Sequence, residues 1–120
     1  TLFPYTTLFR SFLLAQAVGN LVQNALEFTP AGGSVRLLVV SEAGRVRVVV
    51  EDTGSGIPDY ALGKVFDRFY SLPRPDTGRK SSGLGLSIVR EIARLHGGEI
   101  SIENRAEGGV RAVLALPRMW

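Results

Sequence analysis

The chain alternates between two kinds of apolar periodicity, and this alternation constrains its possible folds more than any other feature. Apolar residues recur at helical spacing over residues 12–28 and again from Leu86 to His96. Two pairs of β-rich runs lie between and after these helices, namely Ser34–Val40 with Arg45–Asp52 and Glu99–Glu103 with Val110–Leu116. Short glycine-containing turns join the runs, so each pair predicts a β-hairpin. Helices that cover one face of a mixed, mostly antiparallel sheet make a two-layer α/β sandwich, which is the predicted fold class.

A third helix and a long polar segment are predicted between the two hairpins. The helix runs from about Pro58 to Phe69, with its proline near the first turn, where proline is favoured. Residues 70–82 follow without apolar periodicity. A polar connection of this length inside a compact domain is typical of a lid or a disordered segment. Three helices are therefore expected to cover the sheet.

Length, charge and cysteine content exclude several classes of protein. A chain of 120 residues corresponds to one domain and can bury a sizeable core. Its net charge of +3 is small and its basic residues are scattered, which argues against a nucleic-acid partner. The absence of cysteine excludes a disulfide scaffold and any thiolate metal site. No apolar run approaches the roughly 20 residues that span a bilayer.

Residues 1–11 read as the in-frame translation of a widely used DNA-sequencing adapter. The alternatives are a natural apolar strand or a clipped signal sequence. A signal peptide would need a basic start, a longer apolar core and a small-residue cleavage site, and none is present. We therefore expect residues 1–11 to be non-native, residues 12–120 to form the domain, and the natural sequence before Phe12 to be missing.

Asn20 and Asn24 lie four residues apart on the first predicted helix, so their amides project from one face. An amide oxygen is a hard, neutral ligand that suits a magnesium ion already held by triphosphate oxygens and waters. The alternative is a pair of solvated polar residues on an outer helix face, and the spacing by itself leaves both open.

Asp52 ends an apolar strand and is followed by Gly54 and Gly56. A carboxylate at a strand end can accept a hydrogen bond from an exocyclic amine, and glycines let the backbone approach a ligand closely. The alternative is a turn in which the aspartate caps its own backbone.

Two glycines, Gly83 and Gly85, open the helix that follows the polar segment. Backbone amides at a helix N-terminus make an anion site that suits phosphates, although a glycine pair before a helix is weak evidence. Arg74, Arg79 and Lys80 precede it and could reach a γ-phosphate or remain solvated.

These segments resemble the N, G1, F and G2 boxes of the histidine-kinase ATP-binding domain, which has the Bergerat-type ATP-binding fold. The matching stretches, in order, are Asn20–Ala25, Asp52–Gly56, Phe66–Phe69 and Gly83–Leu86. The resemblance implies ATP and Mg²⁺ as ligands, with Asn24 binding the metal, Phe28 flanking the adenine and Asp52 specifying it. The ATP-binding residues that it implies are Asn20, Asn24, Phe28, Asp52, Gly54, Gly56, Ile57, Phe66, Arg68, Arg74, Lys80, Gly83, Leu84, Gly85 and Leu86.

The same resemblance extends to gyrase-type topoisomerases, Hsp90 chaperones and mismatch-repair ATPases. Those enzymes hydrolyse ATP with a glutamate one helical turn before the magnesium asparagine, and that position is Asn20 here. An amide cannot accept the proton of the attacking water. This favours transfer of the γ-phosphate to a nucleophile on another domain. An anti-sigma-type serine kinase and a nucleotide-binding module or pseudokinase remain as alternatives.

The resemblance also implies features outside the chain. His96, at a helix end before two glycines, is in the wrong context for a phosphoacceptor. The acceptor histidine of the family lies on a separate upstream dimerisation domain, so the fragment should not autophosphorylate alone. A homodimeric parent, a response regulator partner and a cytoplasmic position in a bacterial inner-membrane sensor are implied. Residues 55–61, 69–75 and 80–86 look most like the carbon-source-linked sensors of two-component systems.

Three departures from the family pattern are expected to matter. Glu27 stands where many relatives carry Lys or Arg near the phosphates, and it would repel triphosphate unless it points away. Ser71 replaces an arginine, so Arg68 or Arg74 must supply that charge. Relatives begin with a strand before the first helix, so the sheet is expected to lack its first strand.

Overall fold

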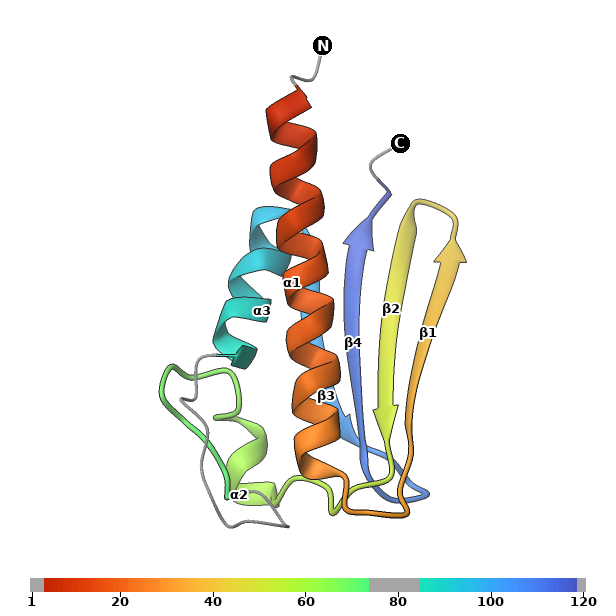
Figure 1. The fold of residues 1–120 in the computed structure, drawn as a ribbon, viewed down its shortest axis with the longest axis vertical. Helices are drawn as coiled ribbons and strands as arrows, with labels where there is room; N and C mark the ends of the chain where they lie inside the picture. Colours follow the sequence, from red (N-terminus) through yellow and green to blue (C-terminus); the bar gives the residue numbers. More distant parts are fainter. Residues whose placement is uncertain (1–3, 74–84, 119–120) are drawn as a thin grey trace.

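The computed structural model describes residues 4–73 and 85–118, with side chains from Leu8 onward. Its elements along the chain (Figure 1) are α1 (Pro4–Phe28), β1 (Val35–Glu42), β2 (Arg45–Asp52), α2 (Asp59–Leu62), α3 (Gly85–Leu95), β3 (Glu99–Asn104) and β4 (Val110–Pro117). No helix within the described ranges combines the length and the hydropathy that a membrane span requires.

Both predicted hairpins are present, and they join into one sheet with the strand order β1-β2-β4-β3. All three strand pairings among the described residues are antiparallel. In the centre of the sheet, Val50 of β2 lies opposite Leu37 of β1 on one side and Ala112 of β4 on the other. The predicted mostly antiparallel sheet is therefore confirmed, and its described part contains no parallel pair.

α1 and α3 pack against the same face of the sheet, which gives the predicted two-layer arrangement (Figure 1). Their apolar residues meet those of the central strands in one core, formed by Ala17, Leu21, Ala25, Val50, Val89, Ile92, Ala93, Ala112, Leu114 and Leu116. Leu114 and Val89 are completely buried. The small residues Ala17 and Ala25, about two helical turns apart on one face of α1, let this helix lie close to the rest of the core.

The first helix begins earlier than the sequence predicted. It starts at Pro4 rather than at residue 12, because proline is well tolerated in a first helical turn and no helix breaker follows it before Gly19. The added turns extend beyond the end of the sheet (Figure 1). Leu8, Phe9 and Phe12 are 61–69% exposed there, so these turns contribute little to the core.

The prediction of a helix from Pro58 to Phe69 is wrong in extent. α2 covers only Asp59–Leu62, with Pro58 as its N-cap and Gly63 as its C-cap. Glycine is among the poorest helix formers, and here it ends the helix after one turn. Residues 63–69 continue as turns, and Phe69 adopts a left-handed backbone with φ of 67°. α2 lies near the end of the sheet instead of covering its face (Figure 1).

Candidate functional site

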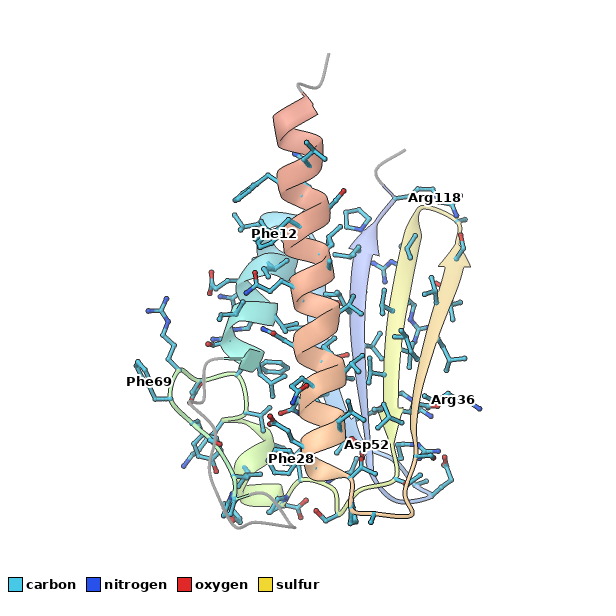
Figure 2. All side chains as sticks on the ribbon, viewed as in Figure 1. Phe12, Phe28, Arg36, Asp52, Phe69 and Arg118 are labelled. Atoms are coloured by element: carbon cyan, nitrogen blue, oxygen red, sulfur yellow. The ribbon has the colours of Figure 1, made fainter. Side chains whose placement is uncertain are left out.

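A cavity of about 360 Å³ opens at the end of the sheet where β2 finishes. Phe28 and Asp52 mark this end in Figure 2. Predicted site residues that line it are Asn20, Asn24, Phe28, Asp52, Gly56, Ile57, Gly85 and Leu86. The fold therefore brings together segments from α1, β2, the following loop and the start of α3. Glu27 and Ser71, the two predicted departures from the family pattern, also line it. The lining residues that sequence reasoning did not select are Gln23, Ser55, Val65, Tyr70, Leu72 and Val110.

The other predicted residues either are absent from the cavity lining or fall outside the described residues. Phe66 and Arg68 are not among the lining residues. The guanidinium of Arg90 lies over the Phe66 ring, 5.8 Å from its centroid, and Arg68 is exposed. Arg74, Arg79, Lys80, Gly83 and Leu84 fall outside the described residues. The ATP-binding roles that the resemblance implies for Phe66 and Arg68 therefore remain predictions.

Asp52 is a buried carboxylate whose two oxygens have different surroundings. Its side chain is held because Oδ1 accepts hydrogen bonds from the backbone N–H of Gly54, at 2.9 Å, and of Val110, at 3.1 Å. The bond from Gly54 is the self-capping turn that the sequence left open, and Asp52 also lines the cavity. Oδ2 takes no part in these two bonds, so it can accept a hydrogen bond from a ligand.

Glycines allow the backbone around Asp52 to pack closely. A Cβ at Gly54 would overlap the carbonyl oxygen of Phe28, and a Cβ at Gly109 would overlap the carbonyl of Asp52. Gly109 also has a φ of 85°, which favours glycine. Gly54 therefore lets the chain pass close to the end of α1. The sequence predicted instead that this glycine would let the backbone approach a ligand.

One face of α1 supplies the polar wall of the cavity. Asn20 Nδ2 donates to the Gly85 carbonyl at 3.3 Å, which ties α1 to the start of α3. Gln23 Nε2 donates to Glu27 at 3.1 Å. Glu27 is half-buried in the cavity wall, so the predicted acidic departure does border the site.

The fit of a metal ion depends on Asn24. No group of three or more His, Cys, Asp or Glu residues that could hold a metal is present among the described residues. A metal bound here would take most of its ligands from a nucleotide and water. The half-buried Asn24 amide on the cavity wall suits that role, because Mg²⁺ prefers oxygen ligands and retains several waters.

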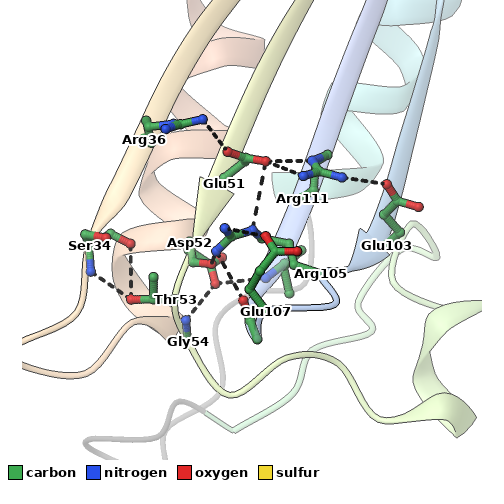
Figure 3. A network of polar contacts seen from close by, with 12 residues as sticks. Ser34, Arg36, Glu51, Asp52, Thr53, Gly54, Glu103, Arg105, Glu107 and Arg111 are labelled. Atoms are coloured by element: carbon green, nitrogen blue, oxygen red, sulfur yellow. Dashed lines mark hydrogen bonds and ion pairs between the residues drawn. The ribbon is translucent and has the colours of Figure 1, made fainter.

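The opposite face of the sheet carries an ion-pair network directly behind Asp52 (Figure 3). Glu51 Oε2 lies 2.6 Å from Arg111 Nη2, and its Oε1 lies 3.3 Å from Arg36 Nη2. The hydrogen bond from Arg111 lowers the pKa of Glu51 despite its burial, and the same contact raises the pKa of Arg111. Arg111 also reaches Glu103, at 3.4 Å, so the network links all four strands of the described sheet.

Arg105 connects this network to the backbone of the site. Its Nη1 donates to the Asp52 carbonyl at 2.9 Å and to the Gly108 carbonyl at 3.2 Å, while Nη2 pairs with Glu107 at 2.9 Å (Figure 3). Sequence reasoning missed this β3–β4 contribution. The only signal was the Gly108-Gly109 turn, which predicted a hairpin and gave no indication that it would reach Asp52.

His96 lies beyond the last turn of α3 and is buried. Its Nδ1 is 2.7 Å from the Ile92 carbonyl oxygen near the end of α3, which also accepts the His96 backbone N–H at 3.3 Å. This is a structural position, away from the cavity lining.

Comparison with known proteins gives matches over nearly the whole chain. The family model described as histidine kinase-, DNA gyrase B- and HSP90-like ATPase matches residues 10–119. Sensor protein CreC of Escherichia coli is 56% identical over 106 residues, which cover 88% of this chain and 22% of CreC. The chain thus spans about a fifth of the length of this relative.

Solved structures agree with the sequence matches. Full-length ShkA in complex with AMPPNP superposes with a TM-score of 0.72 at 32% identity, covering 88% of this chain and 21% of ShkA. Histidine kinase ThkA in complex with the response regulator TrrA superposes with a TM-score of 0.71 at 34% identity, covering 88% of this chain and 28% of that chain.

Proposed function

We propose that this chain, which belongs to the histidine kinase ATPase domains of two-component sensors, binds Mg-ATP in the cavity described above. It would then donate the γ-phosphate of the bound ATP to a histidine on another domain. The observation that carries the proposal is the geometry of Asp52. This buried carboxylate borders a cavity, and two backbone amides hold one of its oxygens. The other oxygen would accept the exocyclic amine of adenine, which guanine lacks at that position.

The remaining cavity residues fit the parts of a nucleotide. Phe28 and Ile57 supply apolar surface for a flat base. Gly85 begins an 11-residue helix, and the backbone amides at a helix N-terminus suit phosphate oxygens. Asn24 would bind a magnesium ion that the triphosphate already holds, and that ion would neutralise charge on the phosphates. The predicted lid cations Arg74 and Lys80 keep their proposed role at the γ-phosphate.

Phosphate transfer is favoured over hydrolysis by the chemistry of Asn20. Its amide cannot act as a general base, and its Nδ2 is directed to the Gly85 carbonyl. The domain would then supply a bound and oriented phosphate donor, and the acceptor nucleophile would come from elsewhere. Positioning and electrostatics carry most of the catalysis in such transfers.

The wider assembly is part of the proposal, because the chain spans about a fifth of CreC. We propose a dimerisation domain that carries the acceptor histidine, a homodimeric parent, a response regulator partner and a cytoplasmic position in an inner-membrane sensor. The AMPPNP-bound ShkA and the ThkA–TrrA complex support the nucleotide and the partner by relationship.

Transfer can be tested by supplying the acceptor in trans. The chain is mixed with the isolated dimerisation domain of CreC and with ATP labelled on its γ-phosphate. We expect acid-labile, base-stable label on the acceptor domain, and none with an acceptor lacking its histidine or with the Asp52→Asn variant. Nucleotide binding without transfer would indicate a binding module or pseudokinase. Acid-stable label on serine would favour a serine kinase instead.

A further inference from the structure

The end of β3 holds the loop that follows β2 through one side chain. Asn104 Oδ1 accepts a hydrogen bond from the Ile57 backbone N–H at 2.7 Å, and Asn104 Nδ2 donates to the Ile57 carbonyl oxygen at 2.8 Å. The planar amide thus pairs with both polar backbone groups of one residue, much as a neighbouring strand would. The two residues are 47 positions apart in sequence.

Gly56 makes this approach possible. It has a φ of 80°, a backbone conformation that side chains rarely adopt. A Cβ built at Gly56 would lie 3.0 Å from Asn104 Oδ1, which is tighter than ordinary van der Waals contact. The glycine therefore provides both the turn and the space that the Asn104 amide requires.

Among the described residues, few other hydrogen bonds hold the loop between Gly54 and α2. In the described part of the chain, the hydrogen bonds made by residues 55–57 are the two with Asn104. Yet Ser55, Gly56 and Ile57 all line the cavity. A wall made of irregular backbone depends on such external bonds for a fixed shape.

We infer that Asn104 is a positioning residue for the nucleotide pocket, which fixes the Ile57 wall against which the base would rest. This inference rests on the proposed ATP-binding function. Asn104 does not line the cavity described above, so its proposed action on the nucleotide is through Ile57. A pre-organised wall avoids the entropy loss of ordering the loop on binding. This gain in affinity arises at the base end of the nucleotide, so it should not depend on magnesium, which binds the phosphates.

The test is the substitution Asn104→Ala, with calorimetric titration of ADP and of a non-hydrolysable ATP analogue, each with and without magnesium. We expect both ligands to bind about tenfold more weakly, the change produced by losing one to two ordinary hydrogen bonds. The ratio of affinities with and without magnesium should stay at its wild-type value. Hydrogen exchange at the Ile57 amide should become faster, because its acceptor is gone.

Two further variants make the result specific. Ser101 lies on the same strand as Asn104 at an exposed position, so Ser101→Ala should leave the affinity for both ligands unchanged. Asn104→Asp keeps an acceptor for the Ile57 N–H but sets a carboxylate oxygen against the Ile57 carbonyl. It should weaken binding as well, and it decides the question if Asn104→Ala fails to fold.

The inference is overturned if wild-type protein binds nucleotide and the folded Asn104 variants bind it equally well. It is also overturned if the loss appears only in the magnesium-dependent part of the affinity, since that would place the effect at the phosphates. Failure of the wild-type chain to bind either ligand is a separate result, which rejects the proposed function itself.

Discussion

At the scale of single residues, the site depends on which face of β2 each carboxylate occupies. Glu51 and Asp52 are adjacent and both buried, and successive strand residues point to opposite faces. Asp52 therefore borders the cavity, while Glu51 meets Arg111 and Arg36 on the open face. Glu51 thus holds strands together, and ligand selection is the role that we propose for the neighbouring Asp52.

Asp52→Asn and Glu51→Gln should separate these roles. We expect Asp52→Asn to weaken binding of an ATP analogue at least about tenfold, because a hydrogen bond to a charged acceptor is lost. Glu51→Gln should leave the affinity within about twofold, since its side chain is on the other face. Calorimetric titration of both variants measures this, and equal losses would contradict the assignment.

The lowered pKa of Glu51 predicts a specific acid sensitivity. Its hydrogen bond from Arg111 lowers the folded-state pKa, whereas the unfolded chain keeps the ordinary value of about 4.3. The stabilisation is present above that value and is lost as the pH falls from it through the lower folded-state pKa. Urea unfolding at a series of acidic pH values should therefore show a steeper loss of stability in wild type than in Glu51→Gln. Parallel pH curves would argue against the ion pair.

Candidate site residues could be selected from the sequence where short motifs carry the information. Asn24 and Asp52 stand in recognisable local patterns, and both line the cavity. Asn104 stands in none, because its partner Ile57 is brought to it only by the pairing of β3 with β4 and β4 with β2. The contact of Arg105 with the Asp52 carbonyl could not be predicted from the sequence for the same reason. Tertiary partners of this kind are set by the fold and leave no local pattern.

At the scale of elements, alternation and glycine turns were sufficient to predict both hairpins. The four predicted strands agree with β1 to β4 to within two residues at each end. The helix predicted at α2 was too long because apolar residues after Gly63, such as Val65 and Phe66, resemble a continuing helix. The glycine outweighed this weak pattern.

The resemblance to histidine kinase domains inferred from the four boxes is confirmed by the family match and by the identity to CreC.

The layered packing predicts a sharp difference between two leucines on the sheet. Leu114 of β4 is fully buried beneath the helices, while Leu37 of the edge strand β1 is 50% exposed. Leu114→Ala should lower the free energy of unfolding by about 3 kcal/mol, and Leu37→Ala by less than about 1 kcal/mol. Denaturant unfolding of both variants checks this. Similar losses would mean that the sheet is covered differently.

At the scale of the whole molecule, the first turns of α1 stand apart from the packed domain. We propose that residues 1–11 are non-native, as their match to a sequencing adapter predicts. The described side chains Leu8 and Phe9 are mostly exposed, whereas Ala17, further along the same helix, is fully buried.

Removal of residues 1–11 should therefore change the free energy of unfolding by less than about 1 kcal/mol and leave nucleotide affinity unchanged. Removal of residues 1–20 serves as the contrasting variant and should abolish folding, because it deletes part of the core. Thermal unfolding of both shortened chains provides the measurement. A large loss of stability on removing residues 1–11 would show that these turns belong to the folded unit.

The most direct test of the central claim is a calorimetric titration of the chain with a non-hydrolysable ATP analogue, with and without magnesium, after a thermal melt has established that it is folded. We expect saturable binding at a single site that is strengthened by magnesium and lost in Asp52→Asn. A folded chain that takes up no nucleotide, or one that binds it equally well without the Asp52 carboxylate, would contradict it.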